Sequence, residues 1–90
     1  MLERKVTVNN PLGLHARAAA QLVRLAGSFQ SNIKLRRTDN GIVADAKSIL
    51  SVLTLAASKG IELKIEVQGA DETAALQAIE DIFVNGFGEI

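Results

Sequence analysis

The chain has 90 residues and a mass of 9.6 kDa, which suits one domain with an aliphatic core, since 48% of its residues are apolar and 3% aromatic. The ten basic and ten acidic side chains give no net charge, which argues against nucleic-acid binding. The chain has no cysteine, which excludes disulfides and Cys-rich metal sites, and its single histidine excludes a His-rich metal site. No apolar run approaches the ~20 residues that span a bilayer, and the charged N-terminus lacks the apolar stretch of a signal peptide, so we expect a cytoplasmic protein without membrane insertion.

The first third of the chain predicts a strand followed by a helix. Residues 2–8 alternate between apolar and polar side chains, apart from Arg4, which is typical of a half-buried strand. Asn, Pro and Gly then form a turn over residues 9–13. Within residues 16–26 the apolar side chains recur at helical spacing on one face, and Gly27 is expected just beyond the end of this helix.

The rest of the chain predicts three further strands and two helices. Residues 33–36 alternate, and an Asp-Asn-Gly turn predicts a hairpin with a return strand. Residues 47–57 predict a short helix, residues 61–68 alternate as the clearest strand, and Asp71 is expected to cap a final helix. The order is βαββαβα. Because each strand has one apolar face, we expect an α+β open-faced two-layer sandwich, formed as a single domain over residues 1–90.

His15 is the one histidine of the chain, and it lies at the predicted start of the first helix. The amides of Ala16 and Arg17 would face any group on its imidazole, and first-turn amides together with the helix dipole bind phosphate. A neutral imidazole is a competent nucleophile towards phosphorus, and the Arg17 guanidinium can hold phosphoryl oxygens. Position alone also allows a surface histidine without special chemistry and an arginine on a solvated helix face.

Ser48 precedes the short apolar helix, so its hydroxyl is expected to cap that helix, a contact worth about 1 kcal/mol. A phosphorylation site is the functional alternative, because a helix N-terminus accommodates phosphate. So short a helix cannot bury Ile49, Leu50, Val52, Leu53 and Leu55 all on one face. Part of the apolar stretch that Ile49, Leu50 and Leu53 form with Leu14 is therefore expected to be exposed as a partner surface, with burial in the core as the alternative. The chain contains no glycine-rich nucleotide loop and no catalytic carboxylate pair, so we expect no cofactor and no metal.

Three segments together resemble the HPr family, the histidine phosphocarriers of the bacterial phosphoenolpyruvate-dependent phosphotransferase system. They are Gly13-Leu14-His15-Ala16-Arg17 with Ala18-Ala19, the stretch from Ala46-Lys47-Ser48-Ile49-Leu50 to Ala57-Ser58-Lys59-Gly60, and Gly69-Ala70-Asp71-Glu72. Their order and spacing extend the resemblance over essentially the whole chain. It implies a four-stranded antiparallel sheet with three helices on one face.

The resemblance also implies residue roles and partners. His15 would accept a phosphoryl group on Nδ1 from phosphorylated enzyme I and pass it to a histidine on a IIA-type domain, and Arg17 matches the active-site arginine. Ser48 matches the serine that an HPr kinase/phosphorylase modifies in many members. The expected partner interface comprises Leu14, Ala18, Arg24, Lys47, Ile49, Leu50 and Leu53. The protein would act as a monomeric carrier rather than as a stand-alone catalyst.

Two features bear on the match to the family and on its branch. Ala18 stands where the family usually has Pro, so the first helical turn is expected to be less stiff. Residues 84–88 are closer to the nitrogen-related branch, NPr, than to the sugar branch.

One alternative function is a regulatory interaction module that acts through Ser48 with His15 silent, although the chain keeps both His15 and Arg17. Another is a metabolite-binding α/β domain of the ACT type.

Overall fold

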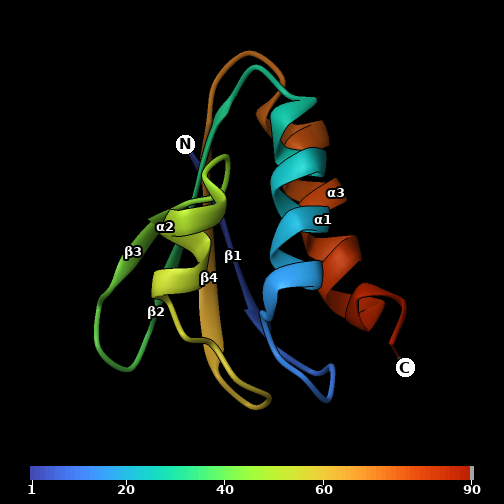
Figure 1. Cartoon of the computed structure of the whole chain (residues 1–90). Coiled ribbons are helices and arrows are strands. Elements are labelled where there is room, and N and C mark those ends of the chain that lie inside the picture. The colour runs from blue at the N-terminus through green and yellow to red at the C-terminus, as the bar shows by residue number, and fades with distance from the viewer. Residues whose placement is uncertain (90) are drawn as a thin grey trace.

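The computed structural model describes residues 1–89 and has the predicted element order (Figure 1). The strands are β1 (Leu2–Thr7), β2 (Asn32–Arg37), β3 (Val43–Asp45) and β4 (Glu62–Gln68). The helices are α1 (Ala16–Gly27), α2 (Ile49–Thr54) and α3 (Glu72–Val84), followed by the short 3-10 turn η1 (Gly86–Gly88). Among the described residues, no helix combines the length and the apolar surface needed to cross a membrane.

The four strands form one antiparallel sheet in the order β1-β4-β2-β3. In the central strand β4, Leu63, Ile65 and Val67 are buried, while Lys64 and Glu66 between them face the opposite side and are partly exposed. This alternation is the pattern read from the sequence, and it gives the sheet one apolar face. The prediction of an α+β open-faced sandwich is therefore confirmed.

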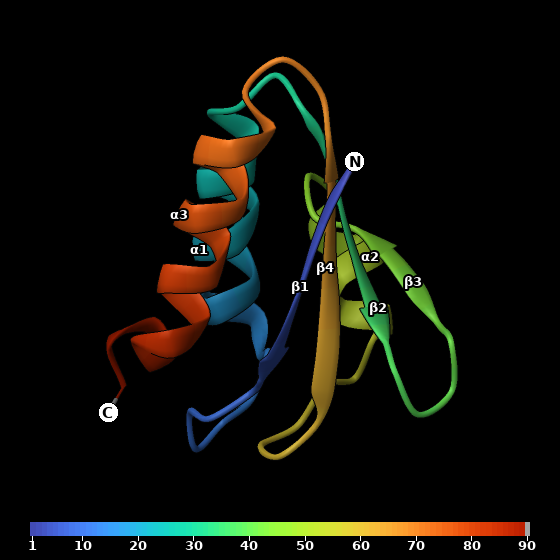
Figure 2. The same ribbon diagram turned by 180° about the vertical axis from the view of Figure 1, so that it is seen from behind.

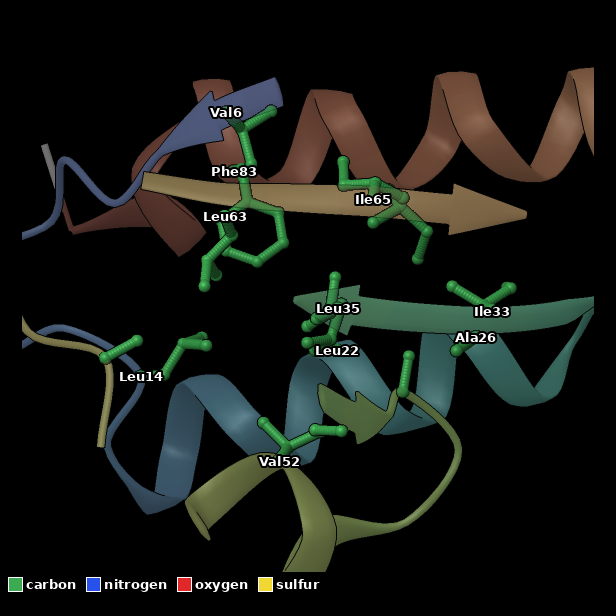
Figure 3. Close-up of a cluster of buried hydrophobic side chains, with 14 of the residues drawn as sticks. Val6, Leu14, Leu22, Ala26, Ile33, Leu35, Val52, Leu63, Ile65 and Phe83 are labelled. Carbon is green, nitrogen blue, oxygen red and sulfur yellow. The ribbon is translucent and has the colours of Figure 1, made fainter. Parts of the chain in front are cut away.

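The three helices cover the apolar face of the sheet (Figures 1 and 2). Helix α3 packs on β1 and β4, α2 packs on β3, and α1 lies between α3 and α2. Helices α1 and α3 run in opposite directions, so the end of α3 lies beside the start of α1 (Figure 1). Figure 3 shows the aliphatic core between the layers, in which Leu22, Leu35, Ile65 and Phe83 are almost fully buried.

Arg4, which interrupts the apolar alternation of the first strand, lies directly opposite the buried Ile65 of β4 and therefore on the helix side of the sheet. Because β1 is an edge strand, the guanidinium can reach past the core to α3. Its Nη1 donates to both carboxylate oxygens of Glu80, at 2.9 and 3.1 Å. The exception in the pattern is thus an ion pair at the rim of the core.

The prediction for the end of α1 is wrong, and the one for the start of α3 is confirmed in position although not in its hydrogen bond. Gly27 is the last residue of α1, and Ser28 beyond it keeps a right-handed helical conformation, so no left-handed glycine is needed there. Asp71 holds the N-cap position of α3, but its carboxylate makes no capping bond. It accepts instead from the amides of Gln30 and Ser31, at 2.8 and 2.9 Å, and from the Ser31 hydroxyl at 2.5 Å. These bonds lower the pKa of Asp71, and the bond from the Ser31 hydroxyl has the largest effect. They also tie the start of α3 to the start of β2.

Candidate functional site

His15 is the N-cap residue of α1, as the sequence predicts. Its backbone is extended, with φ −72° and ψ 177°, and its carbonyl accepts the amide of Ala19 at 2.8 Å. Its side chain makes no capping bond. The imidazole is therefore presented at the start of the helix, where the first amides have no acceptor within the helix.

The turn before His15 is held in place by the loop that follows α2. Gly13 has a left-handed φ of +65°, and a Cβ built on it would lie 2.6 Å from the carbonyl oxygen of Ala57. Leu14 donates its amide to that same carbonyl at 2.8 Å. The buried side chain of Asn10 closes the turn, because its Nδ2 donates to the Gly13 carbonyl at 2.8 Å. Only a glycine allows so close an approach with this backbone.

The carboxylate of Glu89, close to the C-terminal end of the chain, contacts the imidazole of His15. Oε2 of Glu89 is 2.5 Å from Nε2 of His15, and Oε1 accepts from Nδ2 of Asn10 at 3.1 Å. The hydrogen bond with His15, followed by that with Asn10, holds the pKa of Glu89 below its usual value. Sequence reasoning missed the roles of Glu89 and Asn10, because no local pattern links Glu89 to His15 and Asn10, which lie 74 and 79 positions away.

Arg17 and Ala16 lie in the first turn of α1, next to His15. The Arg17 side chain is exposed, and among residues 1–89 it forms no ion pair and no hydrogen bond. Arg24 is also exposed, two helical turns further along the same side of α1. Both guanidinium groups are thus available at the surface that carries the histidine.

Helix α2 has the cap and the exposed apolar side chains that its sequence predicts. The Ser48 hydroxyl accepts the amide of Ser51 at 3.3 Å, which confirms the capping interpretation. Leu50 is 75% exposed, and Ile49 and Leu53 are exposed to 39% and 38%. We call these three residues the α2 patch. Because α2 packs against α1, the patch lies on the helix that neighbours the one carrying His15.

Two residues of the expected partner interface are buried, and a third is tied to a backbone carbonyl. The side chains of Leu14 and Ala18 are buried in the core, exposed to 5% and 0%, so neither can contact a partner. This prediction was wrong because Leu14 lies in the turn that packs against the loop after α2, and Ala18 lies on the core-facing side of α1 with the buried Ala19 and Leu22. The Lys47 ammonium donates to the Phe29 carbonyl at 2.7 Å and ties the segment before α2 to the end of α1. Leu12, which the sequence did not single out, is 67% exposed in the turn before the histidine.

The arrangement suits transfer of a group between proteins, because the imidazole lies at the surface, near an apolar patch on which a partner can rest. The fold and the site together thus define the class as a small open-faced α+β sandwich domain with its one histidine at the start of a helix.

Comparison with known proteins gives the family. Residues 2–85 match the family model described as "PTS HPr component phosphorylation site", and the chain belongs to this HPr family of phosphotransferase-system phosphocarriers. The phosphocarrier protein HPr of Xylella fastidiosa (strain Temecula1) is 47% identical over 89 residues, covering 99% of this chain and 98% of that protein. The phosphocarrier protein NPr of Proteus mirabilis is 41% identical over 86 residues, covering 96% and 94%.

A solved structure supports the same assignment. The crystal structure of HPr-C-His from Thermoanaerobacter tengcongensis matches with a TM-score of 0.92 at 36% sequence identity, covering 100% of this chain and 99% of that chain. The predicted family, fold and histidine-phosphocarrier function are therefore confirmed.

Proposed function

We propose that His15 is the phosphoryl acceptor and that it receives the group on Nδ1 from phosphorylated enzyme I. The observation that carries this proposal is that the single histidine of the chain holds the N-cap position of α1. In the transfer, Nδ1 donates its lone pair to phosphorus while the bond between phosphorus and the donor breaks. The P–N bond that forms is labile, so the group can move on to a histidine of a IIA-type domain.

The first turn of α1 supplies the groups that stabilise the phosphoryl charge. The amides of Ala16 and Arg17 and the dipole of the 12-residue helix favour an anion at this end. The exposed guanidinium of Arg17 can form charge-assisted bonds with phosphoryl oxygens. These interactions stabilise the charge without a covalent bond that would trap the group.

The α2 patch forms the apolar part of the partner surface, and Arg17 and Arg24 of α1 form its basic part. Apolar contact supplies affinity, and the positive charges favour a partner with acidic residues around its own apolar site. Both partners need access to the same imidazole, so enzyme I and the IIA-type domain bind this surface in turn. The protein is accordingly a carrier that exchanges partners, and its catalysis is shared with them.

Ser48 is proposed as a second, regulatory phosphorylation site for an HPr kinase/phosphorylase. It precedes the α2 patch directly, so a phosphate there adds negative charge at the edge of the surface that docks enzyme I. The start of α2 tolerates this charge locally, because its first amides are hydrogen-bond donors. Modification would therefore weaken docking and leave the fold intact.

The test is phosphorylation by phosphoenolpyruvate and a bacterial enzyme I, followed by intact mass spectrometry. We expect one acid-labile phosphoryl group on the wild type and none on a folded His15→Ala variant. A phosphoryl group on His15→Ala would overturn the site. A parallel reaction with ATP and an HPr kinase/phosphorylase should add an acid-stable phosphate, and Ser48→Ala should not receive it. Phosphate on the Ser48→Ala variant would remove Ser48 from the proposal.

A further inference from the structure

We propose that Glu89 is a positioning residue for His15: its carboxylate holds the imidazole so that Nδ1 is presented to the phosphoryl donor. The inference rests on the proposed function, in which His15 accepts the group on Nδ1. It adds a residue from the C-terminal end of the chain to a site otherwise built from the start of α1.

The contact leaves little freedom to the ring. Glu89 Oε2 lies 2.5 Å from His15 Nε2, and the two side chains are exposed to only 17% and 24%. The second oxygen, Oε1, is held by the fully buried Asn10, whose Nδ2 also bonds to the Gly13 carbonyl. The carboxylate is thus anchored to the same turn that places the histidine, and the Nε2 end of the ring is bound to it.

The chemistry of the pair determines which nitrogen reacts. An ionised carboxylate accepts hydrogen bonds only, so Nε2 must carry the proton, and the lone pair of the neutral ring resides on Nδ1. Among residues 1–89, Nδ1 makes no hydrogen bond, so its lone pair is available to phosphorus. A carboxylate that orients a histidine in this way also fixes the reactive nitrogen in catalytic triads and in metal sites.

The carboxylate also acts on the charge that develops during transfer. When Nδ1 donates its electron pair to phosphorus, the ring keeps its proton on Nε2 and becomes more positive. Glu89 lies at that proton and stabilises the positive charge, and its hydrogen bond persists in the phosphorylated state. The ring therefore does not have to turn between acceptance and release.

The end of the chain is built to bring Glu89 to this place. Gly86, Phe87 and Gly88 all have left-handed φ angles, of +59°, +56° and +78°, which turn the chain sharply after α3. Phe87 is buried, and its ring packs edge-on against Phe83 with 5.1 Å between centroids. A bulky residue occupies this backbone region only when its surroundings require it, so the packing of Phe87 holds the turn and directs Glu89 towards α1.

The experiment compares Glu89→Ala and Glu89→Gln with Glu62→Ala, a control that removes an exposed carboxylate from β4, away from the site. Long-range 1H–15N NMR correlations report which ring nitrogen of His15 carries the proton, and thermal unfolding verifies that each variant is folded. Transfer rates from phosphorylated enzyme I are measured over a range of enzyme I concentrations, so that kcat and KM are separated.

We expect the wild type and Glu62→Ala to hold the proton on Nε2 and to accept the phosphoryl group at the same rate. Glu89→Ala should populate both protonation sites and lose about 10–100-fold in kcat, with KM little changed, as for other carboxylates that orient a histidine. Glu89→Gln offers one acceptor oxygen to the two donors that the carboxylate satisfies, Asn10 Nδ2 and His15 Nε2, so it should hold the Nε2 proton less firmly than the wild type and transfer more slowly.

Wild-type ring signals and wild-type rates in Glu89→Ala would overturn the role of Glu89 while leaving His15 as the acceptor. Phosphorylation of the His15→Ala variant would instead overturn the proposed function, so the two failures are distinguishable.

Discussion

Replacing Gly13 by Ala should destabilise the protein and displace its histidine. Gly13 has φ +65°, and a new Cβ would lie 2.6 Å from the Ala57 oxygen and 2.8 Å from the Ser58 Cα, both of them backbone atoms that cannot turn away. The left-handed backbone costs an alanine about 1–2 kcal/mol. The forced separation of the two loops costs about 1–3 kcal/mol more. We therefore expect Gly13→Ala to lose about 2–5 kcal/mol of folding free energy.

Gly41→Ala separates the two contributions. Gly41 has a similar φ of +75°, but nothing lies within 4 Å of its added Cβ, so this control should lose only the backbone part, about 1–2 kcal/mol. Urea unfolding gives both free energies, provided that the m-value stays constant. Phosphoryl acceptance should fall in Gly13→Ala alone, because only that turn carries His15. Equal destabilisation by the two substitutions would refute the close packing of the histidine turn against the loop after α2.

Three further changes test the partner surface, a helix end and the response to acid. Leu50→Ala removes a side chain that is 75% exposed, so the folding free energy should change by less than about 0.5 kcal/mol. The Kd for enzyme I, measured by calorimetry, should rise. An unchanged Kd would remove Leu50 from the interface. Ala56 has φ +48° just beyond α2, so Ala56→Gly should stabilise the protein by about 0.5–1 kcal/mol in thermal unfolding, and a lower Tm would contradict this reading of the strain. The hydrogen bonds from Ser31 and Gln30 lower the folded-state pKa of Asp71, so their stabilisation is present above its ordinary value of 3.8 and is lost as the pH falls through the lower folded-state value. Asp71→Asn should therefore flatten the acid limb of a stability-against-pH curve, and an acid limb as steep as that of the wild type would argue against this contribution.

Several features of the protein were readable from the sequence, because they depend on near neighbours. Strand alternation and helical spacing establish the βαββαβα order, and the one apolar face of each strand requires all helices on that side. The histidine at the start of α1 and the capping serine of α2 are local motifs, so His15 and Ser48 could be placed without a structure. The short length of α2 already implied that some of its apolar side chains remain exposed.

Other features depend on contacts between distant segments, which periodicity does not record. The sequence does not show that Leu14 and Ala18 turn inward, because several rotations of a helix with many alanines bury an apolar face. It does not show that Arg4 meets Glu80, because that pairing follows from the position of β1 at the sheet edge.

The surroundings of His15 show most clearly what the sequence determines and what depends on the tertiary structure. The local sequence determined that a histidine stands at the start of a helix, with an arginine in its first turn. Only the tertiary structure decided the orientation of the imidazole, because the antiparallel packing of α3 on the sheet beside α1 returns the end of the chain to that turn. Glu89 contacts His15 across 74 positions of the chain and Asn10 across 79, and such contacts exist only once the core has closed.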